Sequence, residues 1–214
     1  MSGKFVTIEG CEGVGKSTLT AGLKRYFEQN GIDAVFTREP GGTPVAEKIR
    51  GLILDANNDE TTHITELLLY AAARAQHTEE MIIPAVNAGK IVVCDRYSDS
   101  TLAYQHYARG LSESVCRELN RIAECGVKID LTVFLDLTPE KGFSRKGGAD
   151  KTDRLENAGA AFHRRVYEGF KTIEKREPER FVAVDADKTA EEVLESVIAL
   201  MKAKGVINKG TDRT

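Results

Sequence analysis

The chain has 214 residues, of which 41% are apolar and 29% charged, and its formal net charge is -3. This length and composition predict a single globular domain, and the small negative charge excludes a strong overall attraction to nucleic acid or anionic lipid. No apolar run approaches the roughly 20 residues that a membrane-spanning helix requires, so we expect neither a membrane nor a nucleic acid as partner.

The cysteine pattern favours a reducing compartment. Cys11, Cys94, Cys116 and Cys125 form no C-x-x-C pair, and a strand is predicted within a few residues of Met1. Both features are typical of a cytoplasmic protein with free thiols and no signal peptide. An oxidation-sensitive role for Cys11 is a further hypothesis that the sequence leaves open.

The first predicted elements are a buried strand at residues 5–8 and a helix at residues 18–29, with a glycine-rich loop between them. The loop fits the pattern G-x-x-x-x-G-K-[ST], whose backbone N–H groups surround a phosphate at the helix N-terminus. Lys16 is expected to reach the β- and γ-phosphates of ATP, and the Ser17 hydroxyl to ligate Mg²⁺. A glycine-rich turn that happens to contain a lysine is the alternative. The predicted ATP-binding residues are Gly10, Cys11, Glu12, Gly13, Val14, Gly15, Lys16, Ser17 and Thr18.

Helical patterns separate four more short apolar runs, at residues 34–37, 91–94, 131–135 and 181–184. Runs of this kind are typical of parallel strands that helices cover on both faces. The sequence therefore predicts an α/β protein with a three-layer P-loop NTPase fold and a five-stranded parallel sheet. We expect one domain over residues 1–207 and a flexible C-terminal tail over residues 208–214.

Two helical segments carry specific signals. The pattern of a capping box, Thr189-x-x-Glu192, precedes the last predicted helix. Another helix is predicted between Ser112 as N-cap and Gly126. Its apolar residues follow the spacing of one helix face, which comprises Val115, Leu119, Ile122 and Ala123.

Segment 141–154 shows neither an apolar strand nor the apolar spacing of a buried helix face, because basic side chains and glycines predominate in it. Such a stretch between a strand and a helix predicts a mobile lid that closes over phosphates. A solvated surface loop is the alternative, since most charged runs are no more than that. The basic residues of the segment are Lys141, Arg145, Lys146, Lys151 and Arg154.

Three further segments indicate the kind of ligand. The motif Thr-Arg-Glu-Pro-Gly-Gly-Thr at residues 37–43 leaves the second strand at the sheet edge where α/β proteins bind ligands. Tyr70 and Arg74 share a helix face, so together they could stack on a base and hydrogen-bond its edge. Asp95 and Arg96 follow the third strand and offer a carboxylate for Mg²⁺ and a cation for a second phosphate group. The alternatives are a core position for Tyr70 and a surface ion pair for Arg74.

These motifs occur together with Asp-Arg-Leu-Glu at residues 153–156, and in combination they closely resemble those of thymidylate kinases from residue 3 to about residue 200. The resemblance implies transfer of the γ-phosphoryl group of ATP to dTMP, with Mg²⁺ as cofactor and dTDP as product. It also implies a homodimer, since members of the family commonly dimerise through their helices.

The resemblance further implies roles in binding the nucleoside of dTMP. Tyr70 takes the place of the aromatic ring that stacks on thymine. Arg74 would donate to the O4 edge of the base, and Thr101 and Gln105 would contact it from the other side. Tyr104 would crowd the 2′ position of the sugar and so favour deoxyribose.

The phosphate and sugar of dTMP would lie against Glu39, Arg50 and Arg96 by the same resemblance. Glu12 and Asp95 would lie near the 3′-hydroxyl and Mg²⁺. From the sequence alone, Arg50 also has the alternative of a surface ion pair. The Asp-Ala-Asp segment at residues 185–187 resembles the one that passes close to adenine.

The lid determines the branch of the family that the chain resembles. None of residues 11–14 is basic, as in the bacterial branch, in which the lid supplies the cation for the transition state. Arg145 and Arg154 are the candidates, with Lys146 and Lys151 as helpers. Lids of this branch often have another Arg between the two candidates, where this chain has Gly-Gly-Ala-Asp-Lys. The predicted catalytic residues are Lys16, Asp95, Arg96, Arg145 and Arg154.

Three other functions are alternatives. A nucleoside kinase would need no site for an acceptor phosphate, whereas Arg38, Arg50 and Arg96 favour one. A GTPase needs Asn-Lys-x-Asp after a strand, and residues 208–211 lack the Asp. An ATP-dependent switch protein would need neither the pair of Tyr70 and Arg74 nor a basic lid.

Overall fold

The computed structural model describes residues 3–150 and 152–208. Five parallel strands form one sheet in the order β2-β3-β1-β4-β5, which confirms the predicted five-stranded parallel sheet. Lys151 and tail residues 209–214, about which the sequence makes predictions, lie outside the described residues. The strands are β1 (Lys4–Glu9), β2 (Ala34–Arg38), β3 (Ile91–Asp95), β4 (Leu131–Asp136) and β5 (Phe181–Asp185).

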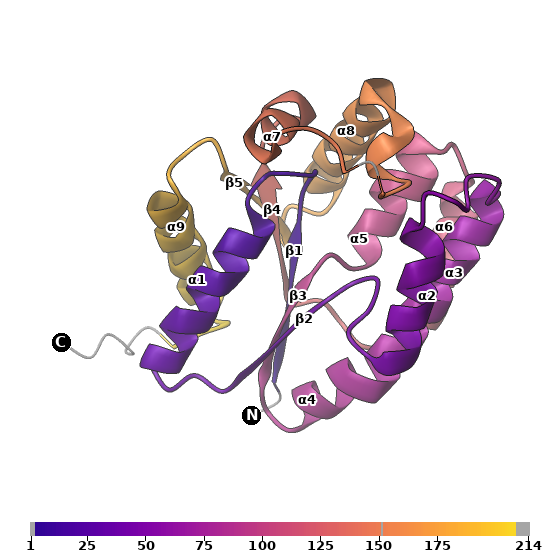
Figure 1. Ribbon diagram of the computed structural model, residues 1–214. Coiled ribbons are helices and arrows are strands. Elements are labelled where there is room, and N and C mark those ends of the chain that lie inside the picture. Colours follow the sequence, from indigo (N-terminus) through magenta and orange to yellow (C-terminus); the bar gives the residue numbers. More distant parts are fainter. Residues whose placement is uncertain (1–2, 151, 209–214) are drawn as a thin grey trace.

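Helices cover both faces of this sheet, as its continuous apolar strands require. In Figure 1, α1 and α9 lie on one side of the sheet, and α2, α3, α5 and α6 lie on the other. None of the helices in the described ranges combines the length and apolarity that crossing a bilayer demands. The α-helices are α1 (Lys16–Gln29), α2 (Pro44–Leu54), α3 (His63–His77), α4 (Ile83–Asn87), α5 (Ser98–Thr101), α6 (Glu113–Ala123), α7 (Pro139–Lys146), α8 (Ala160–Arg176) and α9 (Ala190–Ala203). Two π-helical turns, η1 (Thr78–Ile82) and η2 (Leu102–Ala108), continue α3 and α5, and a 3₁₀ turn, η3 (Glu156–Ala158), precedes α8.

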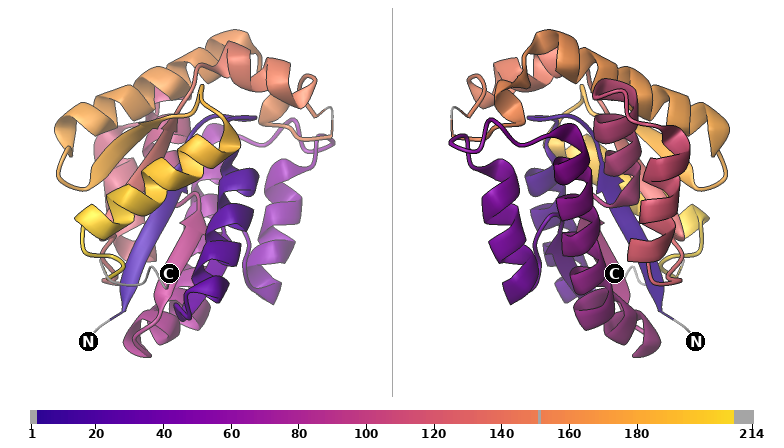
Figure 2. Two further views of the ribbon diagram at one scale, coloured as in Figure 1. Left: turned by 90° about the vertical axis from the view of Figure 1, so that its left-hand side faces the viewer. Right: turned by 90° about the vertical axis from the view of Figure 1, so that its right-hand side faces the viewer.

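The register of the strands brings three loops together at one edge of the sheet. Ile8 of β1 and Arg38 of β2 both lie opposite Asp95 at the end of β3. The loops that follow these strands therefore start at the same level. Helix α7 and residues 152–158 lie above the same edge (Figures 1 and 2).

The predicted capping box of one helix is confirmed, and the predicted apolar face of another is only partly buried. The Thr189 hydroxyl accepts from the backbone N–H of Glu192, and the Glu192 carboxylate accepts from that of Thr189, which completes the capping box at the start of α9. On α6, Val115 and Ile122 are exposed, whereas the buried residues are Cys116, Asn120 and Ala123. Asn120 turns inward and makes hydrogen bonds in the site.

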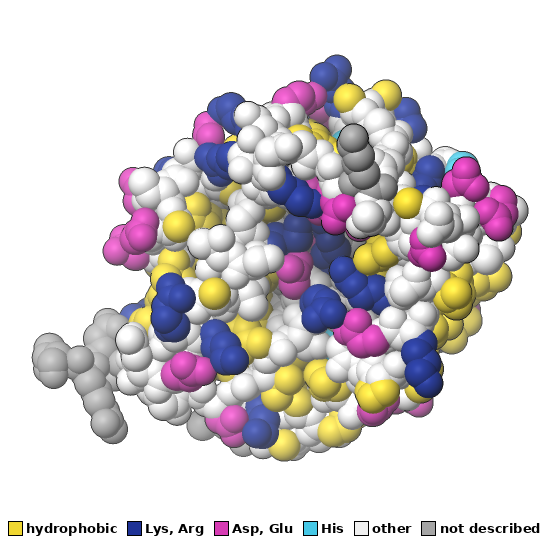
Figure 3. All heavy atoms as spheres, in the orientation of Figure 1, with side chains coloured by type: hydrophobic (Ala, Val, Ile, Leu, Met, Phe, Trp, Pro, Cys, Tyr) yellow, Lys and Arg dark blue, Asp and Glu magenta, His cyan; other side chains and the backbone are white. Residues whose placement is uncertain are grey.

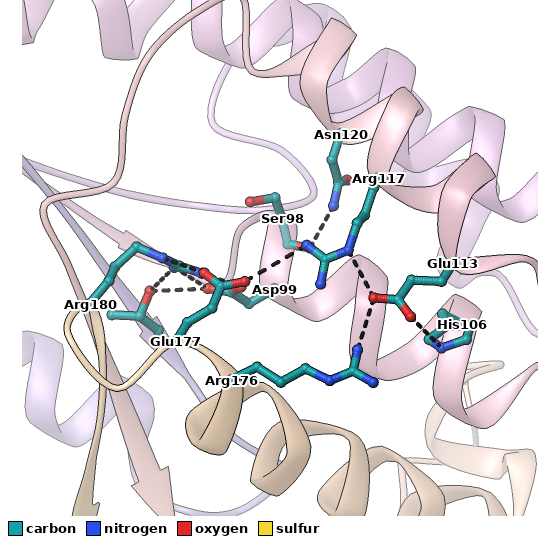
Figure 4. A network of polar contacts seen from close by, with 10 residues as sticks. Ser98, Asp99, His106, Glu113, Arg117, Asn120, Arg176, Glu177 and Arg180 are labelled. Carbon is teal, nitrogen blue, oxygen red and sulfur yellow. Dashed lines mark hydrogen bonds and ion pairs between the residues drawn. The ribbon is translucent and has the colours of Figure 1, made fainter.

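A network of ion pairs fixes α5 and α6 to the turn between α8 and β5 (Figure 4). Arg180 donates to both carboxylate oxygens of the buried Asp99, at 2.7 and 2.9 Å. Glu177 pairs with Arg180 and lies 3.7 Å from Arg117. Because Asp99 is the second residue of α5, this network holds the helix that follows the end of β3.

Candidate active site

A pocket of about 730 Å³ opens at the carboxyl edge of the sheet. Figure 3 shows it as a hollow in which Lys and Arg side chains gather beside carboxylates. Of the predicted site residues, Gly10, Cys11 and Arg154 do not line the pocket. Those that line it are Glu12, Gly13, Val14, Gly15, Lys16, Ser17, Thr18, Glu39, Arg50, Tyr70, Arg74, Asp95, Arg96, Thr101, Tyr104, Gln105 and Arg145.

Lys16 begins α1 and lies folded against its own loop. Its Nζ donates to the carbonyl oxygens of Gly10 and Cys11, at 3.1 and 2.8 Å. Burial and the nearby Arg96 lower the pKa of Lys16, while Glu12 acts in the opposite direction. Phosphate oxygens would be better partners for this amine than the two carbonyls, because they carry full negative charge.

The Cys11 thiol is not poised for oxidation. The side chain is 1% exposed, and burial raises its pKa to about 12 although Lys16 lies near. Oxidation proceeds through the thiolate, which a raised pKa disfavours. The oxidation-sensitive role is therefore not supported.

Ser17 and Asp95 offer a set of oxygen atoms that fits Mg²⁺. The Ser17 side chain is exposed to the pocket at the start of α1. Oδ1 of Asp95 is buried, and no described residue hydrogen-bonds it. A buried carboxylate oxygen without a partner is costly, and a hard divalent cation is a natural partner for it.

Arg96 lines the pocket and is held by Glu12. Its Nη2 donates to Oε1 of Glu12 at 2.8 Å, and the Tyr104 hydroxyl donates to the same oxygen at 2.9 Å. Burial disfavours both charges, but the attraction between them is the larger effect. Arg96 and Lys16 lower the pKa of Glu12 to about 2, and Glu12 raises the pKa of Arg96. The guanidinium also lies over the Tyr104 ring, 5.2 Å from its centroid.

Glu9, at the end of β1, supports the turn that carries Arg96. Arg96 has a left-handed backbone, with φ 68°. The next backbone N–H, that of Tyr97, donates to one oxygen of Glu9 at 2.8 Å, and the Ser100 hydroxyl donates to the other at 2.6 Å. Burial, with the nearby Asp99, raises the pKa of Glu9 to about 7.

The predicted base-binding residues meet at the other end of the pocket. Arg74 is 2% exposed, so the alternative of a surface ion pair is wrong. Its Nε donates to Glu39 at 2.8 Å, and its Nη1 donates to Thr101 and Asn120 at 2.8 and 2.9 Å. Tyr70 is half-buried and lines the pocket near Arg74.

Two of the predicted dTMP residues are held through other partners. Arg50 donates to the carbonyl oxygen of Pro40 at 2.9 Å and faces the pocket. The Gln105 amide donates to Glu66 at 3.0 Å. Both side chains are thus oriented before any ligand binds.

The two lid arginines lie in different surroundings. Arg145 lines the pocket, where it donates to the carbonyl oxygen of Ala186 at 2.6 Å and to Asp187 at 3.0 Å. Arg154 instead donates to the carbonyl oxygen of Ile53 and forms an ion pair with Glu66 at 2.7 Å. One arginine therefore faces ligand space, and the other fastens the lid to α2 and α3.

Several site residues escape the sequence analysis, among them Glu9, Glu66, His77 and Asn120. Glu66 accepts from Gln105, Arg109 and Arg154, and it is fully buried. A lone acidic or polar residue in a helix usually indicates a solvated face, which hides such positions. His77 carried a usable signal, because it lies three residues after Arg74 and so shares its helix face.

The chain is similar in sequence and structure to known proteins. The family model for thymidylate kinase matches residues 8–197. Thymidylate kinases of Desulfosudis oleivorans and Bacillus cytotoxicus are 46% and 47% identical to the chain; the matches cover 96% and 95% of it and 99% of each relative. The crystal structure of thymidylate kinase from Ehrlichia chaffeensis has a TM-score of 0.75 at 32% identity, over 94% of this chain and 99% of that one.

The raised pKa of Glu9 predicts a stability that falls as the pH rises. The ordinary value of 4.5 applies to the unfolded chain and about 7 to the folded one, so the folded state holds an extra proton between these values. The free energy of unfolding should therefore decrease from about pH 4.5 to about pH 7, by at most about 3 kcal/mol.

Glu9→Gln should flatten this fall, measured by urea unfolding at several pH values. Glu12→Gln is the matched control: because the pKa of Glu12 is about 2, its titration lies below the window and the slope should stay that of the parent. An undiminished slope in Glu9→Gln would refute the assignment.

Proposed function

The chain belongs to the thymidylate kinase family and transfers the γ-phosphoryl group of ATP to dTMP, giving dTDP, and we propose that one pocket divides this work between an ATP half and a dTMP half. This proposal rests on one observation. The pocket is lined both by residues 12–19 of the phosphate loop and α1 and by Tyr70, Arg74 and Arg96.

In the ATP half, Lys16 and the backbone amides of the loop hold the phosphates. Ser17 and Asp95 hold Mg²⁺, which neutralises charge on the phosphate oxygens when bound. The unpartnered Oδ1 of Asp95 supports this role. Ala186, Lys188 and Val193 line the side of the pocket toward α9, where we place adenine.

In the dTMP half, Tyr70 stacks on thymine and Arg74 donates to its O4 atom, with Thr101 and Gln105 close by. Arg50 and Arg96 bind the acceptor phosphate. Arg96 suits this task because it lies at the junction of the two halves, and its pairing with Glu12 fixes its direction. Positioning two anionic groups in this way is most of what phosphoryl transfer requires of a protein.

We assign the cation of the transition state to Arg145 and a fastening role to Arg154. Arg145 faces the pocket, and exchange of its bonds to residues 186 and 187 for a phosphoryl oxygen needs only a side-chain movement. Arg154 is occupied by Glu66 and by the backbone of Ile53. A closed lid also excludes water, which would otherwise accept the phosphoryl group.

The acceptor is tested by measuring ADP formation from Mg·ATP with dTMP, dUMP, dCMP, UMP or thymidine. We expect strong turnover with dTMP and weaker turnover with dUMP, since one methyl group changes the transition-state energy by about 1–3 kcal/mol. Turnover with thymidine would favour a nucleoside kinase, and ATP hydrolysis that ignores every acceptor would favour an ATP-dependent switch protein.

The lid assignment predicts unequal effects of two substitutions. Arg145→Ala should lower kcat by on the order of 10³-fold with little change in the KM for dTMP, because an arginine finger acts in the transition state. Arg154→Ala should lower kcat less and raise the KM for both substrates.

Steady-state kinetics with both substrates checks this, with Lys90→Ala as the control. Lys90 precedes β3 at the opposite end of the sheet and pairs with Asp33 at 3.2 Å outside the pocket, so its loss should change neither constant. A kcat of Arg145→Ala near that of the parent would overturn the assignment.

We further propose a homodimer that acts in the cytoplasm. Large apolar side chains with at least 42% exposure lie on three neighbouring helices, and exposed apolar residues on one side of a protein are typical of an interface. They are Val45 and Leu52 of α2, Ile64 and Leu68 of α3, and Val115 and Ile122 of α6. Four free thiols, at residues 11, 94, 116 and 125, suit a reducing compartment.

A charge placed in this surface should separate the protomers. Leu68→Glu is expected to sediment as a monomer at concentrations where the parent sediments as a dimer, because an unpaired carboxylate is costly inside an interface. The matched control is Ala199→Glu, at an exposed position of α9 on the other side of the sheet. An unchanged sedimentation coefficient for Leu68→Glu would place the interface elsewhere.

A further inference from the structure

A chain of buried side chains leads away from Arg74 behind the pocket. Oε2 of Glu39 accepts from Nε of Arg74 at 2.8 Å, and Oε1 of Glu39 lies 3.0 Å from Nδ1 of His77. On the far side of the imidazole, Nε2 lies 2.7 Å from the Thr37 hydroxyl. His77 has no exposed surface, and Glu39 is 5% exposed. His77 does not line the pocket, so any influence on a ligand must pass through Glu39.

The hydrogen bonds assign one tautomer to His77. The Glu39 carboxylate is bound to a cationic guanidinium and acts as an acceptor, so Nδ1 must donate to it. A neutral imidazole then presents a bare Nε2, which accepts from the hydroxyl of Thr37. The loop folds tightly around this pair: a Cβ at Gly42, where φ is 87°, would lie 2.6 Å from both Nε2 and the Thr37 oxygen.

The same bonds determine which nitrogen of Arg74 remains for a ligand. Nε is bound by Glu39, and Nη1 is bound by Thr101 and by Asn120. Asn120 is itself anchored, because its amide donates to the carbonyl oxygen of Ser98 at 3.0 Å (Figure 4). Within the described residues, no hydrogen bond engages Nη2.

Glu39 could bind Arg74 in a second way, which would leave Nη2 unavailable to a ligand. Carboxylates commonly take a guanidinium through two parallel bonds, here from Nε and Nη2. The Nδ1–H of His77 holds Oε1 on the side of the imidazole, and Glu39 makes a single hydrogen bond with Arg74. Without that donor, Oε1 would be left unpaired and would draw Nη2 away from the pocket.

We propose that His77 is a positioning residue that, through Glu39, directs Nη2 of Arg74 at the O4 atom of thymine and so sets the selectivity for thymine over cytosine. This inference rests on the proposed function, in which Arg74 reads O4. Cytosine carries an amine where thymine carries O4. Nη2 of a correctly directed Arg74 and this amine are both donors and cannot hydrogen-bond each other, so kcat/KM for dCMP is lowered.

Two amide substitutions separate the two sides of the imidazole. His77→Asn places its amide near the position of Nδ1 and keeps a donor for Glu39. His77→Gln places its amide near Nε2 and leaves Glu39 without one. The measured quantity is kcat/KM for dTMP divided by kcat/KM for dCMP, with the KM for ATP as a second constant.

We expect His77→Gln to lower this ratio about tenfold or more and His77→Asn to leave it within about threefold of the parent, with the KM for ATP unchanged in both. Thr37→Val, which removes only the far hydroxyl, should resemble His77→Asn. Equal ratios for His77→Gln and the parent, or equal losses for the Gln and Asn variants, would overturn the inference.

Arg74→Met, which has no hydrogen-bond donor, distinguishes failure of this inference from failure of the proposed function. If Arg74→Met leaves the ratio unchanged, Arg74 does not read O4 and both fail. If Arg74→Met lowers the ratio and His77→Gln does not, only the role of His77 fails.

A measurement on the unaltered protein guards against variants that do not fold. In ¹⁵N-labelled protein, the two ring nitrogens of His77 have distinct NMR shifts that report which one carries the proton. The inference requires a protonated Nδ1 and a bare Nε2, and the opposite tautomer would overturn it.

Discussion

Repulsion between cations is the constraint that shapes this pocket. A site for two phosphate-bearing substrates must gather positive charge, and Lys16, Arg74 and Arg96 all line one cavity. The structure balances this charge with carboxylates of its own: Glu12 holds Arg96, and Glu39 holds Arg74, each at 2.8 Å. These pairs keep the guanidinium groups ionised and aimed before a ligand arrives, so that binding needs little reorganisation.

The same balance extends to the lid, which is held at two places. Arg154 pairs with Glu66 on α3, and Arg145 pairs with Asp187 after β5. Between them, the backbone of α7 packs closely on the phosphate loop: a Cβ at Gly142 would lie 2.1 Å from the carbonyl oxygen of Glu12. Glycine is needed for that contact between the lid and the phosphate loop.

Sequence patterns predict the strands and the phosphate loop well, but they predict poorly the buried polar residues that hold the site residues in place. The strands follow from apolar runs, and the phosphate loop follows from glycine spacing, because both depend on residues close in the sequence. Glu9 and His77 act through partners 88 and 38 residues away, which no local pattern encodes. On α6, hydrophobic spacing marks Val115 and Ile122, which are exposed, and misses the buried Asn120, which accepts from Arg74 of a helix distant in the sequence.

The turn after β3 shows why such support is required. In the proposed function Asp95 faces a metal and Arg96 a phosphate, whereas adjacent side chains of a strand would point to opposite faces of the sheet. A left-handed residue at Arg96, φ 68°, turns the chain and brings both groups to one cavity. A side chain in that conformation costs about 1–2 kcal/mol, and glycine, which would avoid the cost, has no guanidinium. The two hydrogen bonds that Glu9 accepts from Tyr97 and Ser100 offset this strain, so a carboxylate outside the pocket holds a residue that lines it.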